Sequence, residues 1–116
     1  THRKYASSAV FVTGHEDPEK NEEIVKWKKL AKSVDTIVIM MGLSRIGIIS
    51  KQLIEGGMKK STPVAVIQNG TTPKQKMIVG TLTNIATKIK KEKMSPPANI
   101  IIGEVVKLHK TIGWKK

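Results

Sequence analysis

The sequence predicts an α/β fold in one domain, because compact apolar runs alternate with amphipathic segments along its 116 residues. The runs at residues 36–39 and 64–67 have the length and continuous apolarity typical of buried strands. Between them, apolar residues recur at the spacing of one helix face: Ile46, Ile49, Leu53 and Ile54. Taken along the whole chain, the pattern predicts the element order β-α-β-α-β-β-α-β.

The first half of the chain is expected to supply two strands and two helices. Residues 8–12 form the first strand and residues 35–41 the second. A helix is predicted over residues 22–32, where two glutamates in the first turn and lysines in the last match the helix dipole. The second helix is expected to be capped by Ser44 and to end at Gly56-Gly57.

The second half is expected to supply three strands, one helix and a tail. Pro63 opens a third strand, and residues 76–79 form a fourth. Residues 99–108 are predicted to form the final strand, after a rigid Ser-Pro-Pro connector. The apolar tail, with Ile112 and Trp114, is expected to fold back or to pack on a partner. The third helix is indicated by apolar residues at helical spacing: Leu82, Ile85, Ala86 and Ile89.

The composition sets limits on the class of protein. The chain has no cysteine, so it has neither disulfides nor thiolate metal ligands, and no apolar run approaches the roughly 20 residues that cross a bilayer. A cytoplasmic location is expected. The chain starts at Thr1 rather than at a methionine, so we expect it to begin inside a longer protein.

The net charge of +12 leaves three interpretations open. Lysines can simply cover solvated helix faces, or they can attract nucleic acid, or they can attract a small and highly carboxylated substrate. The few aromatic residues are not interleaved with the basic clusters, as a base-stacking surface would require. Charge alone does not choose between these interpretations.

No catalytic or metal-binding pattern is found in the chain. His2, His15 and His109 lack metal-ligand spacing, so no metal site is expected. No Gly-x-Ser-x-Gly elbow presents a serine nucleophile, and the glycine fingerprint of dinucleotide-binding folds and the phosphate-binding P-loop are both missing.

Two short stretches that come directly after buried strands are the best candidates for a binding site. In α/β sheets, ligands bind in the crevice beyond the carboxyl ends of the strands. Gly42 would let the backbone approach a ligand, and the flexible Met41 side chain could cover an aromatic ring. Asn69 and Gly70 can take positive φ and leave backbone groups free to recognise an adenine edge. The alternative is structural, with Met-Gly ending a core strand and Asn-Gly forming a plain turn.

Several blocks of residues, in the same order along nearly the whole chain, resemble the uroporphyrinogen-III C-methyltransferases of the tetrapyrrole methylase family. Blocks in the right order are more specific than one short motif. The blocks are Thr1-His2-Arg3, Tyr5-Ala6-Ser7-Ser8, Phe11-Val12-Thr13-Gly14-His15-Glu16, Trp27-Lys28-Lys29-Leu30-Ala31, Asp35-Thr36, Met41-Gly42-Leu43, Leu53-Ile54-Glu55, Pro63-Val64-Ala65-Val66, Asn69-Gly70-Thr71-Thr72, Gly80-Thr81-Leu82 and Ile102-Gly103-Glu104-Val105-Val106.

The resemblance implies a two-domain α/β enzyme that binds S-adenosyl-L-methionine in the cleft between its domains. Such an enzyme methylates uroporphyrinogen III at two ring carbons and gives precorrin-2, through precorrin-1, for sirohaem or cobalamin. Residues 1–116 resemble the C-terminal domain only, so the N-terminal domain and the catalytic residues are expected outside this chain. The chain alone is then expected to transfer no methyl group. The resemblance also suggests a homodimer.

The resemblance assigns roles to individual residues. Met41 matches the family's methionine at the adenosine site and Gly70 matches its glycine there, while Gly42 and Asn69 flank them. Arg3, at the domain junction, is expected to bind a substrate propionate or acetate, which suits the fork of a guanidinium group.

Two other interpretations of the sequence remain open. One is another member of the same superfamily, acting on a later corrin precursor, on diphthamide or on RNA. The other is a basic nucleic-acid-binding module without enzyme activity.

Overall fold

The computed structural model of the protein describes residues 1–15 and 24–113. It confirms the α/β fold and the predicted order β-α-β-α-β-β-α-β, and adds two 3₁₀ turns and a short C-terminal helix. The elements are β1 (Ala9–Thr13), α1 (Trp27–Ser33), β2 (Thr36–Met40), η1 (Leu43–Arg45), α2 (Ile46–Glu55), β3 (Pro63–Gln68), β4 (Lys76–Thr81), α3 (Ile85–Lys91), β5 (Ala98–Ile102), η2 (Glu104–Leu108) and α4 (His109–Ile112).

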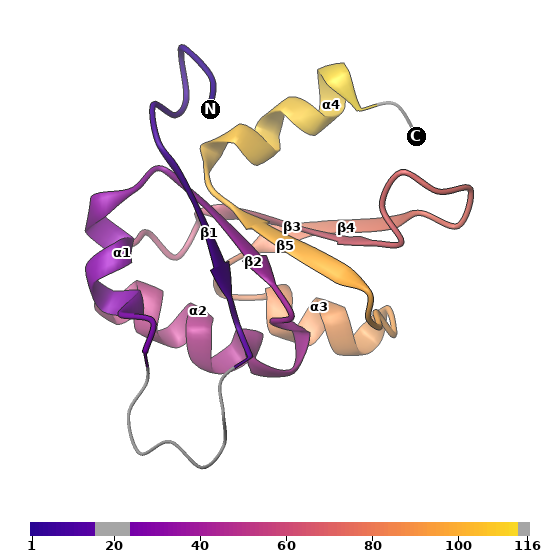
Figure 1. The fold of residues 1–116 in the computed structure, drawn as a ribbon, viewed down its shortest axis with the longest axis horizontal. Coiled ribbons are helices and arrows are strands. Elements are labelled where there is room, and N and C mark those ends of the chain that lie inside the picture. The colour runs from indigo at the N-terminus through magenta and orange to yellow at the C-terminus, as the bar shows by residue number, and fades with distance from the viewer. Residues whose placement is uncertain (16–23, 114–116) are drawn as a thin grey trace.

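The five strands form one mixed sheet in the order β1-β2-β5-β3-β4 (Figure 1). Strand β1 is parallel to β2, whereas β5 is antiparallel to both of its neighbours, β2 and β3. Strands β2 and β3 therefore run in the same direction on either side of β5. Their carboxyl ends lie at the same edge of the sheet, next to the start of β5.

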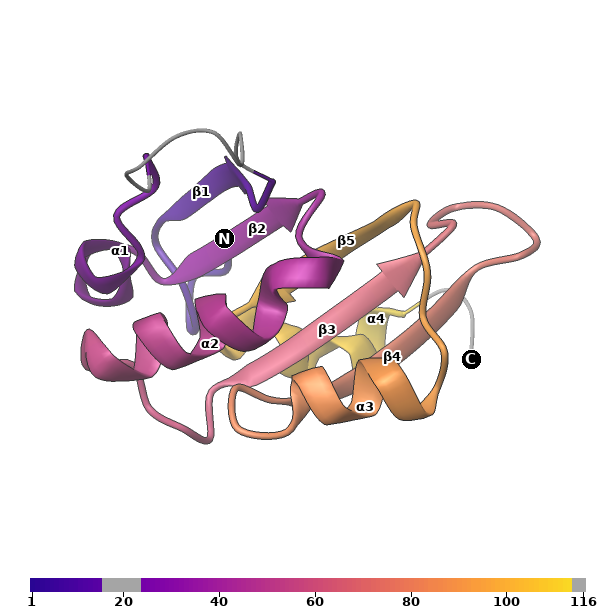
Figure 2. The ribbon, with the colours of Figure 1, turned by 90° about the horizontal axis from the view of Figure 1, so that it is seen from below.

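Helices α1, α2 and α3 cover one face of the sheet, and η2 and α4 lie on the other (Figures 1 and 2). The helix-covered face is the core, because six strand side chains on it are fully buried: Ile37, Ile39, Val64, Val66, Ile100 and Ile102. On the opposite face η2 packs on β3 and β5. On the β1–β2 side of that face, Phe11 is 70% exposed.

The predicted final strand over 99–108 is wrong beyond Ile102. Gly103 takes a φ of 144°, which a residue with a side chain rarely adopts, and the chain leaves the sheet there. The next apolar residues form η2 instead, and Val106 is buried against the rest of the domain. A run of β-branched residues therefore indicated burial correctly but not the backbone conformation.

The helix boundaries also differ from the predictions in places. Ser44 does not cap α2, because it lies inside η1 and its side chain makes no capping bond. Helix α1 begins at Trp27, which is buried in the core; Glu22 and Glu23 lie outside the described residues. Trp114 lies outside them as well. No helix in the described part of the chain is long and apolar enough to cross a membrane.

Asp35 attaches the N-terminal segment to the start of β2. Its carboxylate accepts hydrogen bonds from the Ser7 backbone N–H at 2.9 Å, the Ser7 hydroxyl at 3.1 Å and the Ser8 hydroxyl at 3.4 Å. In return, the Asp35 backbone N–H donates to the Ser8 hydroxyl oxygen at 2.9 Å. These bonds, with the one from the Ser7 backbone first, lower the pKa of the Asp35 carboxyl below its ordinary value of 3.8.

Asp35→Asn should reduce the loss of stability of this chain in acid. Because the folded-state pKa of Asp35 is lowered, its contribution is present above pH 3.8 and is lost as the pH falls through the folded pKa. The free energy of unfolding, measured by urea titration between pH 6 and pH 2, should fall less steeply below about pH 4 in the variant. Ser7→Ala should give an intermediate slope, since the Ser7 backbone bond remains. Parallel curves for Asp35→Asn and the wild type would contradict this assignment.

Candidate functional site: two cavities at the carboxyl ends of the strands

The two candidate stretches lie at one edge of the sheet, on either side of the start of β5. Met41 and Gly42 come after β2, and Asn69 and Gly70 come after β3. The Asn69 backbone N–H donates to the Pro97 carbonyl at 3.0 Å, so the second stretch is attached to the connector that enters β5. The expectation that each stretch lies beyond the carboxyl end of a strand agrees with the structure.

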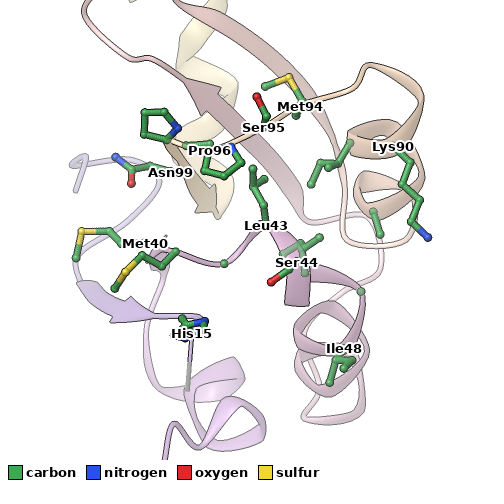
Figure 3. Close-up of a pocket in the computed structure, with 18 residues that line it drawn as sticks. His15, Met40, Leu43, Ser44, Ile48, Lys90, Met94, Ser95, Pro96 and Asn99 are labelled. Carbon is green, nitrogen blue, oxygen red and sulfur yellow. The ribbon is translucent and has the colours of Figure 1, made fainter. Parts of the chain in front are cut away.

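Two cavities open at this edge, one on each face of the sheet. The first, of about 970 Å³, lies on the helix-covered face between η1, α2, α3 and the connector (Figure 3). The second, of about 760 Å³, lies on the opposite face below η2 and α4. Both cavities are lined by residues 97–99, so they meet at the start of β5. Met41 and Gly42 line the first cavity, whereas Asn69 and Gly70 line the second.

The first cavity has an unusually apolar and exposed wall. Met40, Met41 and Ile48 are 42%, 65% and 52% exposed, and they account for three of the large exposed hydrophobic side chains in the described chain. Large apolar side chains that gather around an open cavity are typical of a surface that binds something. Methionine side chains are flexible and polarizable, which suits contact with a flat organic ring.

Both stretches contain a strained backbone. Met41, Asn69 and Thr71 have φ of 56°, 51° and 66°, in the left-handed region that residues with side chains rarely adopt. Such residues cost of order 1 kcal/mol each and gather at functional sites. Positive φ was expected at Asn69 and Gly70; it occurs at Asn69, while Gly70 does not adopt it and Thr71 does.

Close packing requires a glycine at position 42, which the sequence did not reveal. Gly42 is buried, and a Cβ at this position would lie 2.5 Å from the Ile39 Cγ2 atom. Close packing therefore excludes a side chain there, whether or not a ligand approaches. Gly70 is exposed, and its Cβ would meet only the Ile67 Cγ2 atom, at 3.2 Å.

Hydrogen bonds within the loop after β3 hold its shape. The Thr71 backbone N–H donates to the Gln75 side-chain oxygen at 2.7 Å, and the Thr72 hydroxyl donates to the Asn69 carbonyl at 2.7 Å. Gln68, at the end of β3, accepts a hydrogen bond from the Ser95 backbone N–H at 2.8 Å. The loop is thus fixed to itself and to the connector before any ligand arrives, which reduces the entropy lost on binding.

The ionisable residues that line the cavities are few and none is acidic among the described residues. Lys90 and His15 line the first cavity, and His109 lines the second. The cavities would therefore not repel an anionic ligand. Among residues 1–15 and 24–113 there is no group of three histidine or acidic side chains that could hold a metal ion.

Arg3 lies apart from the four other candidate residues. It belongs to a turn in which the His2 backbone N–H donates to the Ala6 carbonyl at 2.7 Å, ahead of β1. Because β1 and β2 are parallel, this turn is at the opposite end of the two strands from Met41. Arg3 is exposed and lines neither cavity.

The connector and the start of β5 are the part of the site that the sequence did not reveal. Residues 97–99 line both cavities, yet the sequence identified only a rigid Ser-Pro-Pro link and a strand. Their central position depends on the pairing of β5 with both β2 and β3, which no local pattern in the sequence specifies.

The mixed sheet with two apolar cavities at the carboxyl ends of its strands defines an α/β domain with a candidate ligand site. Residues 2–86 match the family described as Tetrapyrrole (Corrin/Porphyrin) Methylases. Because this match covers more than half of the chain, the protein belongs to the tetrapyrrole methylase family.

Known relatives are similar to this chain over nearly its whole length. It is 45% identical over 116 residues to the S-adenosyl-L-methionine-dependent uroporphyrinogen III methyltransferase of Methanosarcina barkeri, covering 100% of this chain and 46% of that protein. It is 46% identical over 114 residues to the siroheme synthase of Nitrosomonas eutropha, covering 98% of this chain and 24% of that protein. The chain thus spans about half the length of the first of these proteins and a quarter of the second.

Solved structures share the fold. The uroporphyrin-III C-methyl transferase of Thermus thermophilus, complexed with S-adenosyl homocysteine, superimposes with a TM-score of 0.77 at 30% identity, covering 93% of this chain and 47% of that one. The cobalt precorrin-4 methyltransferase CbiF has a TM-score of 0.78 at 22% identity, covering 89% of this chain and 43% of that one, which shows a common fold only.

Proposed function

We propose that this chain is the C-terminal domain of an S-adenosyl-L-methionine-dependent uroporphyrinogen-III C-methyltransferase. The observation that carries the proposal is the 45% identity, over every residue of the chain, to a protein with that name. The proposed whole enzyme converts uroporphyrinogen III to precorrin-2, through precorrin-1, for sirohaem or cobalamin. Residues 1–116 form one subdomain of it, an N-terminal domain supplies the catalytic groups, and the enzyme is a cytoplasmic homodimer.

The methyl donor is proposed to lie at the carboxyl ends of β2 and β3. Its sulfonium carries the methyl group that is transferred. Met41 provides an apolar contact for the donor's adenosine, and Gly70 leaves an open approach to the loop backbone, with Gly42 and Asn69 beside them. The apolar walls keep water from the ligand, and the hydrogen-bonded loop is already in place for binding.

The acceptor is proposed to be attracted by the basic surface and held in part by Arg3. Uroporphyrinogen III carries eight carboxylates, and the chain has a net charge of +12 with no acidic side chain lining either cavity in the described part. Such a field raises the encounter rate with a polyanion. Arg3 lies at the opposite end of β1 from the donor site. Any contact that it makes with the acceptor is therefore at the periphery of the tetrapyrrole.

Another family member acting on a later corrin precursor or on RNA is the alternative. The likeness to a cobalt precorrin-4 methyltransferase concerns the fold only and does not favour either acceptor. The methyl-transfer experiment described next separates these possibilities.

The whole protein, given S-adenosyl-L-methionine with a labelled methyl group, should transfer two methyl groups to each uroporphyrinogen III. The product is analysed by mass spectrometry, and bulk RNA is offered as a parallel acceptor. The isolated 116-residue chain should transfer none, because the proposed catalytic groups lie outside it. Label in RNA, or in neither acceptor, would contradict the proposed substrate.

A further inference from the structure

Asn99 occupies the centre of the site. It is the second residue of β5, where it pairs with Met40 of β2 on one side and with Ile67 of β3 on the other. It lines both cavities and is exposed. In the close-up, Asn99 and Met40 lie on the same side of the first cavity (Figure 3).

The side-chain amide of Asn99 is available for a ligand. It makes no hydrogen bond within the described part of the chain, in contrast to the amides of Gln68 and Gln75. The side-chain oxygen of Gln68 accepts from Ser95, and that of Gln75 accepts from Thr71. Asparagine is also disfavoured in strands, so its position in β5 has no evident benefit for folding. Both the donor and the acceptor of this amide therefore remain free at the point where the cavities meet.

The neighbours of Asn99 form two apolar walls. Paired residues of adjacent strands point to the same face of a sheet, so Met40, Asn99 and Ile67 project in one direction. This is the face opposite to the buried side chains of Ile39, Ile100 and Val66, on which the second cavity opens. Strands β2 and β3 are two strand spacings apart, roughly 10 Å. A planar ring can stand on its edge in this space, with one face toward Met40 and the other toward Ile67. Its edge then meets the amide of Asn99.

We propose that Asn99 selects the adenine base of the methyl donor by hydrogen bonds to its N6 amino group and to the ring nitrogen N7. This inference rests on the proposed function, since it places the base of that donor. The match is chemical: the amide oxygen accepts from the amino group while the amide nitrogen donates to the ring nitrogen, a pairing in which asparagine recognises adenine elsewhere. In hypoxanthine an oxygen replaces the amino group, so O6 and N7 are both acceptors and the amide oxygen would face an acceptor in either orientation of the Asn99 amide.

The test compares two ligands in the whole protein. S-adenosylhomocysteine and S-inosylhomocysteine are titrated by calorimetry into the wild type, Asn99→Ala and Asn99→Asp. The wild type should bind the adenosyl ligand about ten-fold more tightly than the inosyl ligand, and Asn99→Ala should lose most of that preference. Asn99→Asp keeps the shape of the side chain but cannot donate, so its adenosyl affinity should fall as well.

An amide away from both cavities supplies the control, and each outcome has a separate meaning. Gln52→Ala, on α2 and away from both cavities, should retain the wild-type preference, and thermal unfolding checks that every variant is folded. Absence of adenosyl-ligand binding by the wild type removes the proposed function, and this inference with it. Binding with no preference in the wild type, or with an unchanged preference in Asn99→Ala, overturns the inference alone. An equal loss of both ligands in Asn99→Ala also overturns it.

Discussion

Replacing Gly103 with alanine should lower the free energy of unfolding of this chain by about 2–4 kcal/mol. The backbone there has φ 144° and ψ 171°, a region open almost only to glycine. In addition, a Cβ would lie 2.5 Å from the Asp35 carbonyl oxygen, which belongs to the backbone and cannot swing away. Strain and overpacking therefore act together, and each costs about 1–3 kcal/mol.

The large effect arises from the position of Gly103 between β5 and η2. Its N–H donates to the Pro63 carbonyl at 3.0 Å, and its carbonyl accepts from the Val106 N–H at 3.1 Å. The turn thus directs η2 over β3, where it helps to enclose the second cavity. Any backbone shift that relieves the clash with Asp35 would also move η2 relative to the second cavity.

A second glycine provides the matched control for Gly103→Ala. Gly47 lies in α2, and a Cβ there would make only an ordinary contact, 3.9 Å from the Ala86 Cβ atom. Gly47→Ala should stabilise the chain by about 0.5–1 kcal/mol, because alanine loses less conformational freedom in a helix. Urea unfolding followed by circular dichroism measures both variants. Similar shifts in the two would show that the backbone of Gly103 is not strained.

The element order could be predicted because local patterns specify it. The runs Thr36-Ile37-Val38-Ile39 and Val64-Ala65-Val66-Ile67 form β2 and β3, and helical spacing identified α2 and α3. The course of the chain after Ile102 could not be predicted, since residues 104–106 resemble a strand in composition and only the turn at Gly103 removes them from the sheet. The strand order also depends on pairings between segments far apart in the sequence, which local propensity does not determine.

Part of the site could also be predicted from local sequence patterns. A stretch directly after a buried strand can be located from sequence, so Met41 and Asn69 were placed at the correct edge. The separation of the two stretches into different cavities depends on β5 lying between β2 and β3. The position of β5 between β2 and β3 also places Asn99 at the centre of the site. In the sequence, Asn99 is a single asparagine in an apolar run, and nothing there indicates this central position. Whether these residues bind the methyl donor stays a prediction.

In the whole protein, Met41→Ala should weaken binding of S-adenosylhomocysteine by about ten-fold or more without unfolding the domain. The Met41 side chain is 65% exposed, so its removal leaves the core unchanged, and alanine tolerates the positive φ no worse than methionine does. Burial of a methionine against a ligand contributes about 1.5–3 kcal/mol, and each 1.4 kcal/mol is a factor of ten in affinity. Calorimetric titration gives the affinity, and thermal unfolding checks the fold.

Gly70→Val and Ile24→Ala complete the comparison with Met41→Ala. Valine at Gly70 would occupy the mouth of the second cavity, so a ligand that spans both cavities should lose affinity in this variant as well. Ile24 is 60% exposed but lines neither cavity, so Ile24→Ala should bind as the wild type does. A loss in Met41→Ala alone would confine the donor to the first cavity. Wild-type affinity in both Met41→Ala and Gly70→Val would show that the two residues are structural, and that the donor is held elsewhere.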